Sequence, residues 1–108
     1  MRDPNNPCLF CNINESGLAH INDLAYASYD SYPVSKDHCL IIPKRHIKDY
    51  FDLSKDELIA CYELIKIIKE EILIKDQTVK GFNLGTNIGK VSGQSILHCH
   101  FHLIPRRK

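Results

Sequence analysis

Short apolar stretches separated by polar breaks predict the strands of a small sheet. Residues 19–21 and 26–29 are brief apolar runs on either side of a polar break, which is typical of a hairpin of two short strands. Residues 38–42 (HCLII) form a nearly continuous apolar run and predict a central strand. Residues 81–86 predict one further strand before the end of the chain.

One long amphipathic helix is predicted after the central strand. Ser54 and Glu57 have the spacing of a capping box, in which each side chain accepts a hydrogen bond from the other residue's backbone N–H. Apolar residues then recur at helical spacing to about Lys75, namely Leu58, Cys61, Tyr62, Ile65, Ile68 and Ile72. A second apolar set is wider than one small sheet would cover and predicts a second buried face in a homodimer, namely Ile59, Leu64, Ile67 and Leu73.

The last predicted strand has the most unusual pattern in the chain. His98, His100 and His102 alternate with single apolar residues, which matches the period of two of a strand. We therefore expect the three imidazoles on one face and the apolar residues between them on the other, facing the core. Since a strand rises about 3.3 Å per residue, neighbouring imidazoles would lie roughly 6.6 Å apart, and two of them could act on one small group.

A glycine-containing loop, residues 87–95, leads into this strand. Its two glycines, two hydroxyls, amide and lysine suit an anion, because backbone N–H groups exposed by glycine can approach a phosphate closely. Residues 44–50 are basic and predict a short helix or a turn. Residues 3–7 are polar, contain proline and predict a loose lead-in.

Length, charge and cysteine content narrow the class of protein. A chain of 108 residues predicts one domain spanning residues 1–108. Lys and Arg total 14 against 13 Asp and Glu, so no overall field directs the chain to nucleic acid or to an anionic membrane. We expect neither a signal peptide nor a membrane span. Cys39, Cys61 and Cys99 lie in apolar patterns and predict buried thiols, and the cysteine usage predicts a cytoplasmic protein.

The histidine row favours chemistry over packing. Three buried histidines on one face would each need a polar partner, which disfavours a purely structural role. Zinc ligation by alternating histidines is an alternative, but no carboxylate that could activate a zinc-bound water follows His102. The local sequence favours nucleophilic catalysis on phosphate, because a neutral imidazole is a nucleophile once its other nitrogen donates to a fixed acceptor. Gly93, Gln94 and Ser95 would supply donors to the phosphate oxygens, and no catalytic metal is required.

Residues 93–104 (GQSILHCHFHLI) resemble the signature of the histidine triad (HIT) superfamily. The likeness extends through PVSKDH at 33–38, LIIPKRH at 40–46 and CLFC at 8–11, and it covers nearly the whole chain. It implies an α+β fold with an antiparallel sheet of about five strands, one long helix and a short helix, usually in a homodimer that joins two sheets. The implied activity is hydrolysis or transfer at the α-phosphate of a nucleotide through a nucleotidyl-histidine intermediate.

The same resemblance implies roles for individual residues. His100 matches the nucleophile, His98 matches the first histidine of the triad, and His102 matches the third, which helps to orient and polarise the site. Gln94 and Ser95 match residues that contact the phosphate and the leaving group.

Three further positions are implied to support the nucleotide. Asn87 matches a polar position that lines the phosphate pocket. Asp30 falls where the family binds the ribose hydroxyls, and His38 matches a supporting histidine beside the triad. From the residues alone, Asp30 and Asn87 are also ordinary turn formers.

The C-x-x-C pair, Cys8 and Cys11, raises the question of a metal. By itself the pair is a weak signal, and buried inert thiols or a redox pair are open alternatives. The resemblance implies that both cysteines join His46 and His98 around a zinc ion, as in similar HIT proteins and the related galactose-1-phosphate uridylyltransferases. Four N and S ligands without an open position would make this zinc structural.

These observations lead to one main functional hypothesis. It is a cytoplasmic, homodimeric nucleotide hydrolase acting on dinucleoside polyphosphates or nucleoside phosphoramidates, with purine nucleotides favoured and no nucleic-acid or membrane partner. The alternatives are a nucleotidyltransferase or phosphorylase, a nucleotide-binding regulatory protein with vestigial hydrolysis, and a zinc-carrying scaffold. The basic residues 106–108 are interpreted as a solvated end, with a contact to polyphosphate as the alternative.

Overall fold

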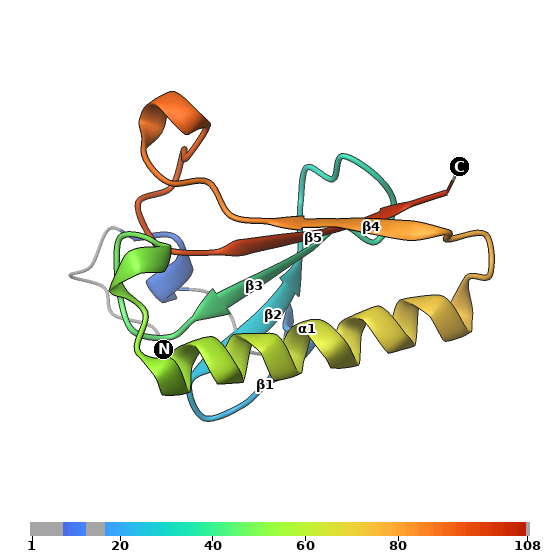
Figure 1. Cartoon of the computed structure of the whole chain (residues 1–108), viewed down its shortest axis with the longest axis horizontal. Coiled ribbons are helices and arrows are strands. Elements are labelled where there is room, and N and C mark those ends of the chain that lie inside the picture. Colours follow the sequence, from blue (N-terminus) through green and yellow to red (C-terminus); the bar gives the residue numbers. More distant parts are fainter. Residues whose placement is uncertain (1–7, 13–16, 108) are drawn as a thin grey trace.

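Five antiparallel strands form one sheet in the order β1-β2-β3-β5-β4 (Figure 1). The computed structural model describes residues 8–12 and 17–107, so the predicted lead-in at 3–7 lies outside the described residues. The strands are β1 (His20–Ile21), β2 (Ala25–Tyr29), β3 (Cys39–Pro43), β4 (Gly81–Gly85) and β5 (Phe101–Arg106). The predicted hairpin, central strand and strand at 81–86 are confirmed, and the fold class is α+β.

A single long helix, α1 (Lys55–Lys75), covers one face of the sheet (Figure 1). Its predicted capping box is present, because Ser54 Oγ accepts from Glu57 N–H at 3.1 Å and Glu57 Oε1 accepts from Ser54 N–H at 2.9 Å. Arg45 donates to both Glu57 carboxylate oxygens at 2.8 and 2.9 Å, and these bonds lower the pKa of Glu57 to about 2. The first turn of α1 is thereby tied to the loop after β3.

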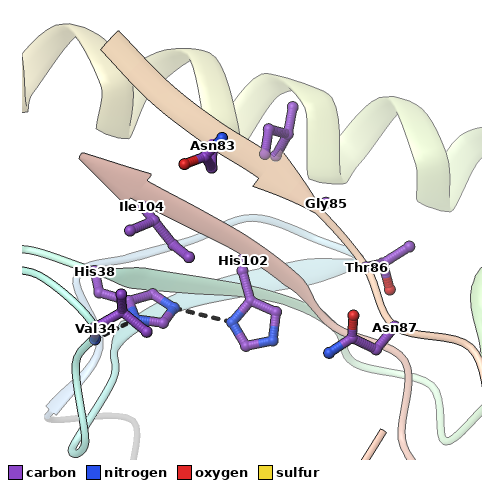
Figure 2. Close-up of a pocket in the computed structure, with 9 residues that line it drawn as sticks. Val34, His38, Asn83, Gly85, Thr86, Asn87, His102 and Ile104 are labelled. Atoms are coloured by element: carbon purple, nitrogen blue, oxygen red, sulfur yellow. Dashed lines mark hydrogen bonds between the residues drawn. The ribbon is translucent and has the colours of Figure 1, made fainter. Parts of the chain in front are cut away.

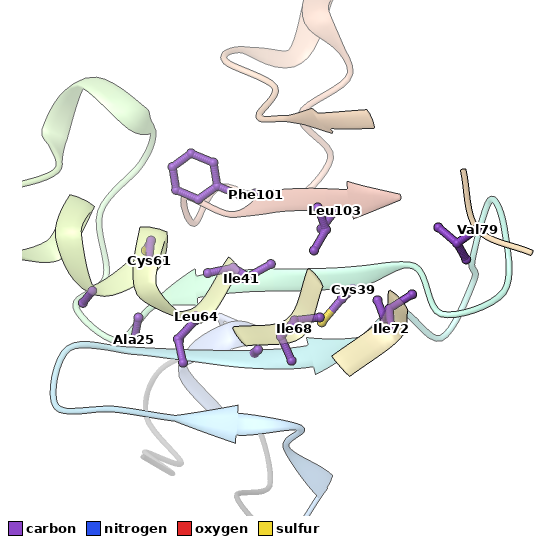
Figure 3. Packing of buried hydrophobic residues seen from close by; sticks show 12 residues of the cluster. Ala25, Cys39, Ile41, Cys61, Leu64, Ile68, Ile72, Val79, Phe101 and Leu103 are labelled. Carbon is purple, nitrogen blue, oxygen red and sulfur yellow. The ribbon is translucent and has the colours of Figure 1, made fainter. Parts of the chain in front are cut away.

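The main core lies between α1 and the sheet (Figure 3). The helix buries Ala60, Cys61, Leu64, Ile68 and Ile72 against the side chains of β2, β3 and β5. Leu64 is 2% exposed, so its assignment to a second face was wrong, whereas Leu58 and Tyr62 of the predicted core stripe are 38% and 57% exposed. Cys39, Cys61 and Cys99 are buried as predicted, and burial raises the pKa of each thiol to about 12.

A smaller core covers the opposite face of the sheet. Tyr26, Leu40 and Ile42 pack there against Phe10, which comes from the short helix η1 (Phe10–Asn12). The Tyr26 hydroxyl donates to the Phe10 carbonyl and holds η1 on the sheet. Because β3 is buried on both faces, its apolar run shows no alternation. Within the described ranges, no helix combines the length and apolar character needed to cross a bilayer.

Two predicted boundaries were wrong. The last strand begins only at Phe101, since Ile41 opposite Phe101 is the last registered pair of β3 and β5. Pro43 has no N–H to donate, and its carbonyl accepts from the His98 ring at 2.8 Å, so the ladder stops short of His98 and His100. The short helix predicted within 44–50 is η3 (Tyr50–Asp52), which begins after Asp49 caps it by accepting from Phe51 N–H.

Candidate functional site

The segment immediately before β5 carries the first two histidines of the row. Its backbone is fixed from two sides, because Cys99 N–H donates to the Ile47 carbonyl at 2.8 Å and Thr86 Oγ1 donates to the His100 carbonyl at 2.7 Å. His98 and His100 are 0% and 7% exposed, and His102, on β5, is half-buried. The three side chains therefore start from a rigid backbone but do not share one regular strand.

The His100 ring has a defined tautomer. Its Nδ1 lies 2.8 Å from the His98 carbonyl, and a carbonyl oxygen only accepts, so Nδ1 carries the hydrogen and donates it. In the neutral ring Nε2 then holds the lone pair. His100 lines a cavity of about 650 Å³, here called the His100 cavity, together with Leu9, Phe10, Asp30, Ile96 and His102 among others. The arrangement presents a nucleophilic nitrogen beside a space for a ligand.

His102 presents an N–H donor where His100 has a lone pair, because its tautomer is set by a hydrogen bond from His38 (Figure 2). Val34 N–H donates to His38 Nδ1 at 3.1 Å, so the neutral His38 ring carries its hydrogen on Nε2. His38 Nε2 lies 2.9 Å from His102 Nδ1 and donates to it, which leaves the hydrogen of His102 on Nε2. The ring centroids of His100 and His102 are 5.1 Å apart. A lone-pair nitrogen and an N–H donor thus stand side by side.

Burial keeps the His38 and His102 rings neutral. Desolvation lowers the pKa of His102, and the neighbouring His100 and His38 lower it further against the opposing effect of Asp30. Desolvation also lowers the pKa of His38, which Asp30 partly counteracts. Both rings therefore favour the uncharged form at neutral pH, and this is the form in which the hydrogen-bond chain from Val34 fixes their tautomers.

Asp30 and Asn87 line two different pockets, and His102 lines both of them. Asp30 lines the His100 cavity, where its Oδ1 accepts from Tyr32 N–H at 3.0 Å and its Oδ2 lies 3.6 Å from His38 Nε2. Asn87 lines a second pocket of about 370 Å³ together with His38 and His102 (Figure 2). The turn role of Asp30 considered from sequence is present, and its carboxylate still faces the cavity.

The glycine-containing loop contains the short helix η4 (Lys90–Ser92) and is tied down by Gln94. The buried Gln94 amide donates to the carbonyls of Lys48 at 2.7 Å and Ile96 at 3.1 Å, and its oxygen accepts from Gly89 N–H. These bonds engage both ends of the side chain, so they hold the loop, while the predicted contact of Gln94 with phosphate stays a prediction. Gly93 has φ +97°, and a Cβ there would lie 3.3 Å from Asn87 Nδ2, so both the backbone conformation and the tight contact favour glycine. Ser95 lines the His100 cavity.

The two cysteines of the C-x-x-C pair meet the two predicted histidines. The ligand atoms of Cys8, Cys11, His46 and His98 all lie within 4.8 Å of one another, which is close enough to hold a metal ion. Cys8 Sγ and Cys11 Sγ lie 3.3 and 3.5 Å from His98 Nδ1, and Cys11 Sγ lies 3.2 Å from His46 Nδ1. Because His98 Nε2–H donates to the Pro43 carbonyl, its Nδ1 lone pair faces the sulfurs.

Sequence patterns did not assign a role to Phe10 or Thr86. The Phe10 ring makes edge contacts with both His98 and His100, at centroid distances of 5.9 and 5.0 Å. The only sequence signal was that Phe10 lies between the two cysteines. Thr86 holds the His100 carbonyl, and nothing in the sequence marks it, because that contact depends on how β4 runs beside the histidine segment.

Comparison with known proteins assigns the chain to a family. The sequence profile of the HIT domain matches residues 14–108. The chain belongs to the HIT family. A HIT family protein from Bacillus anthracis has a similar solved structure, with a TM-score of 0.88 and 32% identity over 95% of this chain and 75% of that one. A HIT family member from Bacillus subtilis has a TM-score of 0.86 and 29% identity, over 94% and 74% of the two chains. The expected HIT fold is confirmed.

Relatives of this HIT chain include proteins with named activities. An uncharacterized HIT-like protein of Saccharolobus solfataricus is 33% identical over 91% of this chain and 73% of its own length. An adenosine 5′-monophosphoramidase of Schizosaccharomyces pombe is 30% identical over 92% of this chain and 74% of its own. An adenylylsulfatase of Arabidopsis thaliana is 34% identical over 95% of this chain and 54% of its own. The family thus includes hydrolases of nucleotide derivatives.

Proposed function

We propose that this protein is a nucleotide hydrolase that acts at the α-phosphate of nucleoside phosphoramidates or dinucleoside polyphosphates through a nucleotidyl intermediate on His100. The observation that carries the proposal is the 2.8 Å hydrogen bond from His100 Nδ1–H to the His98 carbonyl. It leaves the Nε2 lone pair as the nucleophile of a ring that lines the His100 cavity. The names of the Schizosaccharomyces and Arabidopsis relatives both refer to adenosine derivatives, which supports a purine nucleotide as substrate.

The proposed reaction has two displacements at phosphorus. The His100 Nε2 lone pair forms a bond to the α-phosphorus, and the bond to the leaving group breaks with its electron pair, which takes a proton from solvent. Water then attacks the same phosphorus and releases a proton, and the electron pair of the phosphorus–nitrogen bond returns to Nε2. The Nε2–H of His102 donates to a phosphate oxygen during both steps, when negative charge on the phosphoryl group shifts most.

The remaining predicted residues are proposed to hold the nucleotide. Asp30 lines the same cavity as His100, which supports the binding of ribose hydroxyls by its carboxylate. The Ser95 hydroxyl is proposed to donate to the phosphate, because Ser95 lines the His100 cavity, and Asn87 lies beside His102 in the adjoining pocket. The Gly93 N–H donates to the Lys90 carbonyl at 3.0 Å, so its contact with phosphate stays a prediction. His38 acts through His102, to which it donates a hydrogen bond.

We further propose that the Cys8, Cys11, His46 and His98 cluster holds a structural zinc ion. A tetrahedral zinc with Zn–N of about 2.1 Å and Zn–S of about 2.3 Å separates its ligand atoms by roughly 3.4–3.8 Å. The Sγ–Nδ1 distances of 3.2, 3.3 and 3.5 Å are each within about 0.4 Å of the roughly 3.6 Å that such a zinc sets for a sulfur–nitrogen pair. Zinc bound there would cross-link η1 to the segment before β5, so the metal is expected to stabilise the fold rather than to react.

We propose that two copies of the chain form a homodimer through the edge of the sheet at β4. Among the described strands β4 pairs only with β5, so its outer edge has backbone groups available for a further strand. A groove of about 550 Å³ lies beside it, lined by Leu58, Tyr62 and Ile65 of α1 and by Leu84 of β4. Tyr62→Glu should convert a dimer into a monomer in analytical ultracentrifugation, whereas Ile74→Glu, at a 79% exposed position, should not.

A substrate panel tests the proposed activity. Adenosine 5′-phosphoramidate and diadenosine tetraphosphate are incubated with the zinc-loaded protein, and products are followed by phosphorus NMR. Release of AMP is the expected result. Formation of ADP upon addition of inorganic phosphate would instead identify a phosphorylase, and tight AMP binding without turnover of either compound would identify a regulatory protein. A cytoplasmic location stays a prediction from the cysteine usage of the sequence.

A further inference from the structure

Arg107, in the stretch interpreted from sequence as a solvated end, is held in a dense set of hydrogen bonds. Its side chain is only 22% exposed. Its guanidinium donates to Ser35 Oγ at 2.8 Å, to the Lys36 carbonyl at 3.0 Å, to Asp37 Oδ2 at 3.4 Å and to Asp76 Oδ2 at 3.0 Å. Three of these four acceptors belong to consecutive residues of the loop between β2 and β3. A single planar side chain therefore spans the turn that precedes His38.

The turn held by Arg107 is one that the backbone does not favour by itself. Asp37 has φ +70°, which lies in the left-handed region that residues other than glycine rarely adopt. Its carboxylate accepts one hydrogen bond on each oxygen, from the Arg107 guanidinium to Oδ2 at 3.4 Å and from Lys75 Nζ to Oδ1 at 3.1 Å. Ser35 adds a second tie to β5, because its hydroxyl donates to the Pro105 carbonyl at 2.8 Å. These contacts fix the turn on the end of β5.

The same turn supplies the donor that sets the histidine tautomers. His38 N–H donates to the Ser35 carbonyl at 3.1 Å, which closes the turn, and Val34 N–H then reaches His38 Nδ1 at 3.1 Å. The Val34 N–H is the hydrogen-bond donor that requires a lone pair on His38 Nδ1, and the Asp30 carboxylate, with Oδ2 3.6 Å from His38 Nε2, favours the same tautomer more weakly. His38 Nε2 is the atom that donates to His102 Nδ1. The position of the turn therefore determines, through His38, which ring nitrogen of His102 carries the hydrogen.

We propose that Arg107 is a positioning residue, which holds the 34–38 turn so that Val34 fixes the tautomer of His38 and, through it, that of His102. Its importance for turnover rests on the proposed function, whereas the tautomers can be measured in the resting protein. Arg106 is a matched control, because it is the neighbouring arginine and its Nε donates to Asn83 at 2.7 Å instead of to an acceptor in the turn. Its charge also lowers the pKa of His38, so all variants are compared at a pH well above the usual pKa of histidine, where both rings are neutral.

Side-chain nitrogen NMR of the zinc-loaded protein tests this inference. In the unmodified protein, His102 should show a protonated Nε2 and an unprotonated Nδ1, with signals assigned by His38→Gln and His102→Gln. Arg107→Gln should move both nitrogens of His102 toward the average of the two tautomers, and Arg106→Gln should leave them unchanged. Turnover of Arg107→Gln should fall about tenfold, with a smaller change in KM, as is common for residues that orient a reacting group.

A milder variant covers the case in which Arg107→Gln does not fold. Ser35→Ala removes one acceptor of Arg107 together with the tie to Pro105, and it should shift the His102 signals in the same direction by a smaller amount. The His102 signals of Arg107→Lys should lie between those of the unmodified protein and those of Arg107→Gln. Lysine keeps the positive charge but cannot reach all four acceptors with one planar group. Unchanged His38 and His102 tautomers in folded Arg107→Gln or Ser35→Ala would overturn the inference. Altered tautomers with no activity on any substrate would instead uphold it and refute the proposed function.

Discussion

His98 and His100 lie two residues apart and present opposite nitrogens. His98 donates from Nε2 to the Pro43 carbonyl and faces the cysteine sulfurs with Nδ1. His100, which lines the His100 cavity, donates from Nδ1 to the His98 carbonyl, so its lone pair is on Nε2. In both cases a backbone carbonyl takes one nitrogen and thereby decides which lone pair remains. The same side chain can therefore serve a metal cluster at one position and nucleophilic chemistry at the next.

The two regions also differ in what surrounds them. The four residues that could hold a metal come from η1 and the residues just before it, from the loop after β3 and from the segment before β5, so a bound metal would cross-link distant parts of the chain. The His100 cavity instead gathers His100, His102, the Asp30 carboxylate and apolar walls around a space of about 650 Å³. Substitutions in the His100 cavity should therefore lower turnover without changing the metal content, and substitutions of the four Cys and His residues should lower the metal content.

The largest expected effect is the loss of turnover in His100→Asn. Removing the nucleophile should lower kcat about 10³-fold or more, because both displacements require Nε2. The metal content should stay at one ion per chain, since His100 is not a member of the cluster. His20→Asn is the control, because His20 pairs with Glu71 on the surface at 2.7 Å. Both values are measured on the same preparation by steady-state kinetics and elemental analysis.

The converse experiment is Cys11→Ser, which should abolish stoichiometric metal binding. With zinc supplied at about a hundredfold over its Kd, loss of the site should reduce the free energy of unfolding by roughly 3 kcal/mol, measured by urea denaturation. Cys39→Ala changes a buried thiol outside the cluster and should keep the metal. A full complement of metal in Cys11→Ser would contradict the assigned cluster.

Phe10 connects the two regions and should show an intermediate effect. Its ring contacts both His98 and His100, and it lines the His100 cavity. Phe10→Ala should weaken AMP binding about tenfold in calorimetry, close to 1.4 kcal/mol, while metal content is retained. Phe51→Ala, at a 77% exposed position, is the matched control. Unchanged AMP affinity in Phe10→Ala would separate the nucleotide from this cavity.

The smallest expected effect is a dependence of stability on mildly acidic pH. Burial lowers the pKa of His38 and His102, so below about pH 6.5 the unfolded chain binds more protons than the folded one. The stability that these two rings contribute should be fully present above that pH and should be lost as the pH falls below it toward their lowered pKa values. Glu57, with a pKa of about 2, acts only in a more acidic range, below about pH 4.5. The urea midpoint of metal-free His38→Gln should vary less with pH than that of the unmodified protein, and an equal slope would argue against these shifts.

Regular periodicity made most of the fold predictable from the sequence. The capping box placed the start of α1 correctly, and the continuous apolar run marked β3, because local hydrogen bonding and burial on both faces leave direct traces in the residues. The alternation of histidines placed a strand correctly but extended it too far. Its true start depends on Pro43, a residue of the neighbouring strand that the pattern does not include.

The sequence predicted which residues gather at the site, but it did not predict the hydrogen bonds that join them. Motif positions brought together Cys8, Cys11, His46 and His98 as expected. No pattern indicated that Arg107 would grip the 34–38 turn, because that contact joins residues about 70 apart through side-chain geometry alone. Tautomers were equally hidden, since they depend on which carbonyl or N–H lies within reach after folding.

The most direct test of the central claim is the location of the covalent intermediate. The protein is mixed with a slow adenylyl substrate, quenched at alkaline pH, digested and analysed by mass spectrometry. One nucleoside monophosphate on His100, absent from His100→Asn, is the predicted result. Turnover without any adduct at His100, or an adduct on His98 or His102 instead, would contradict it.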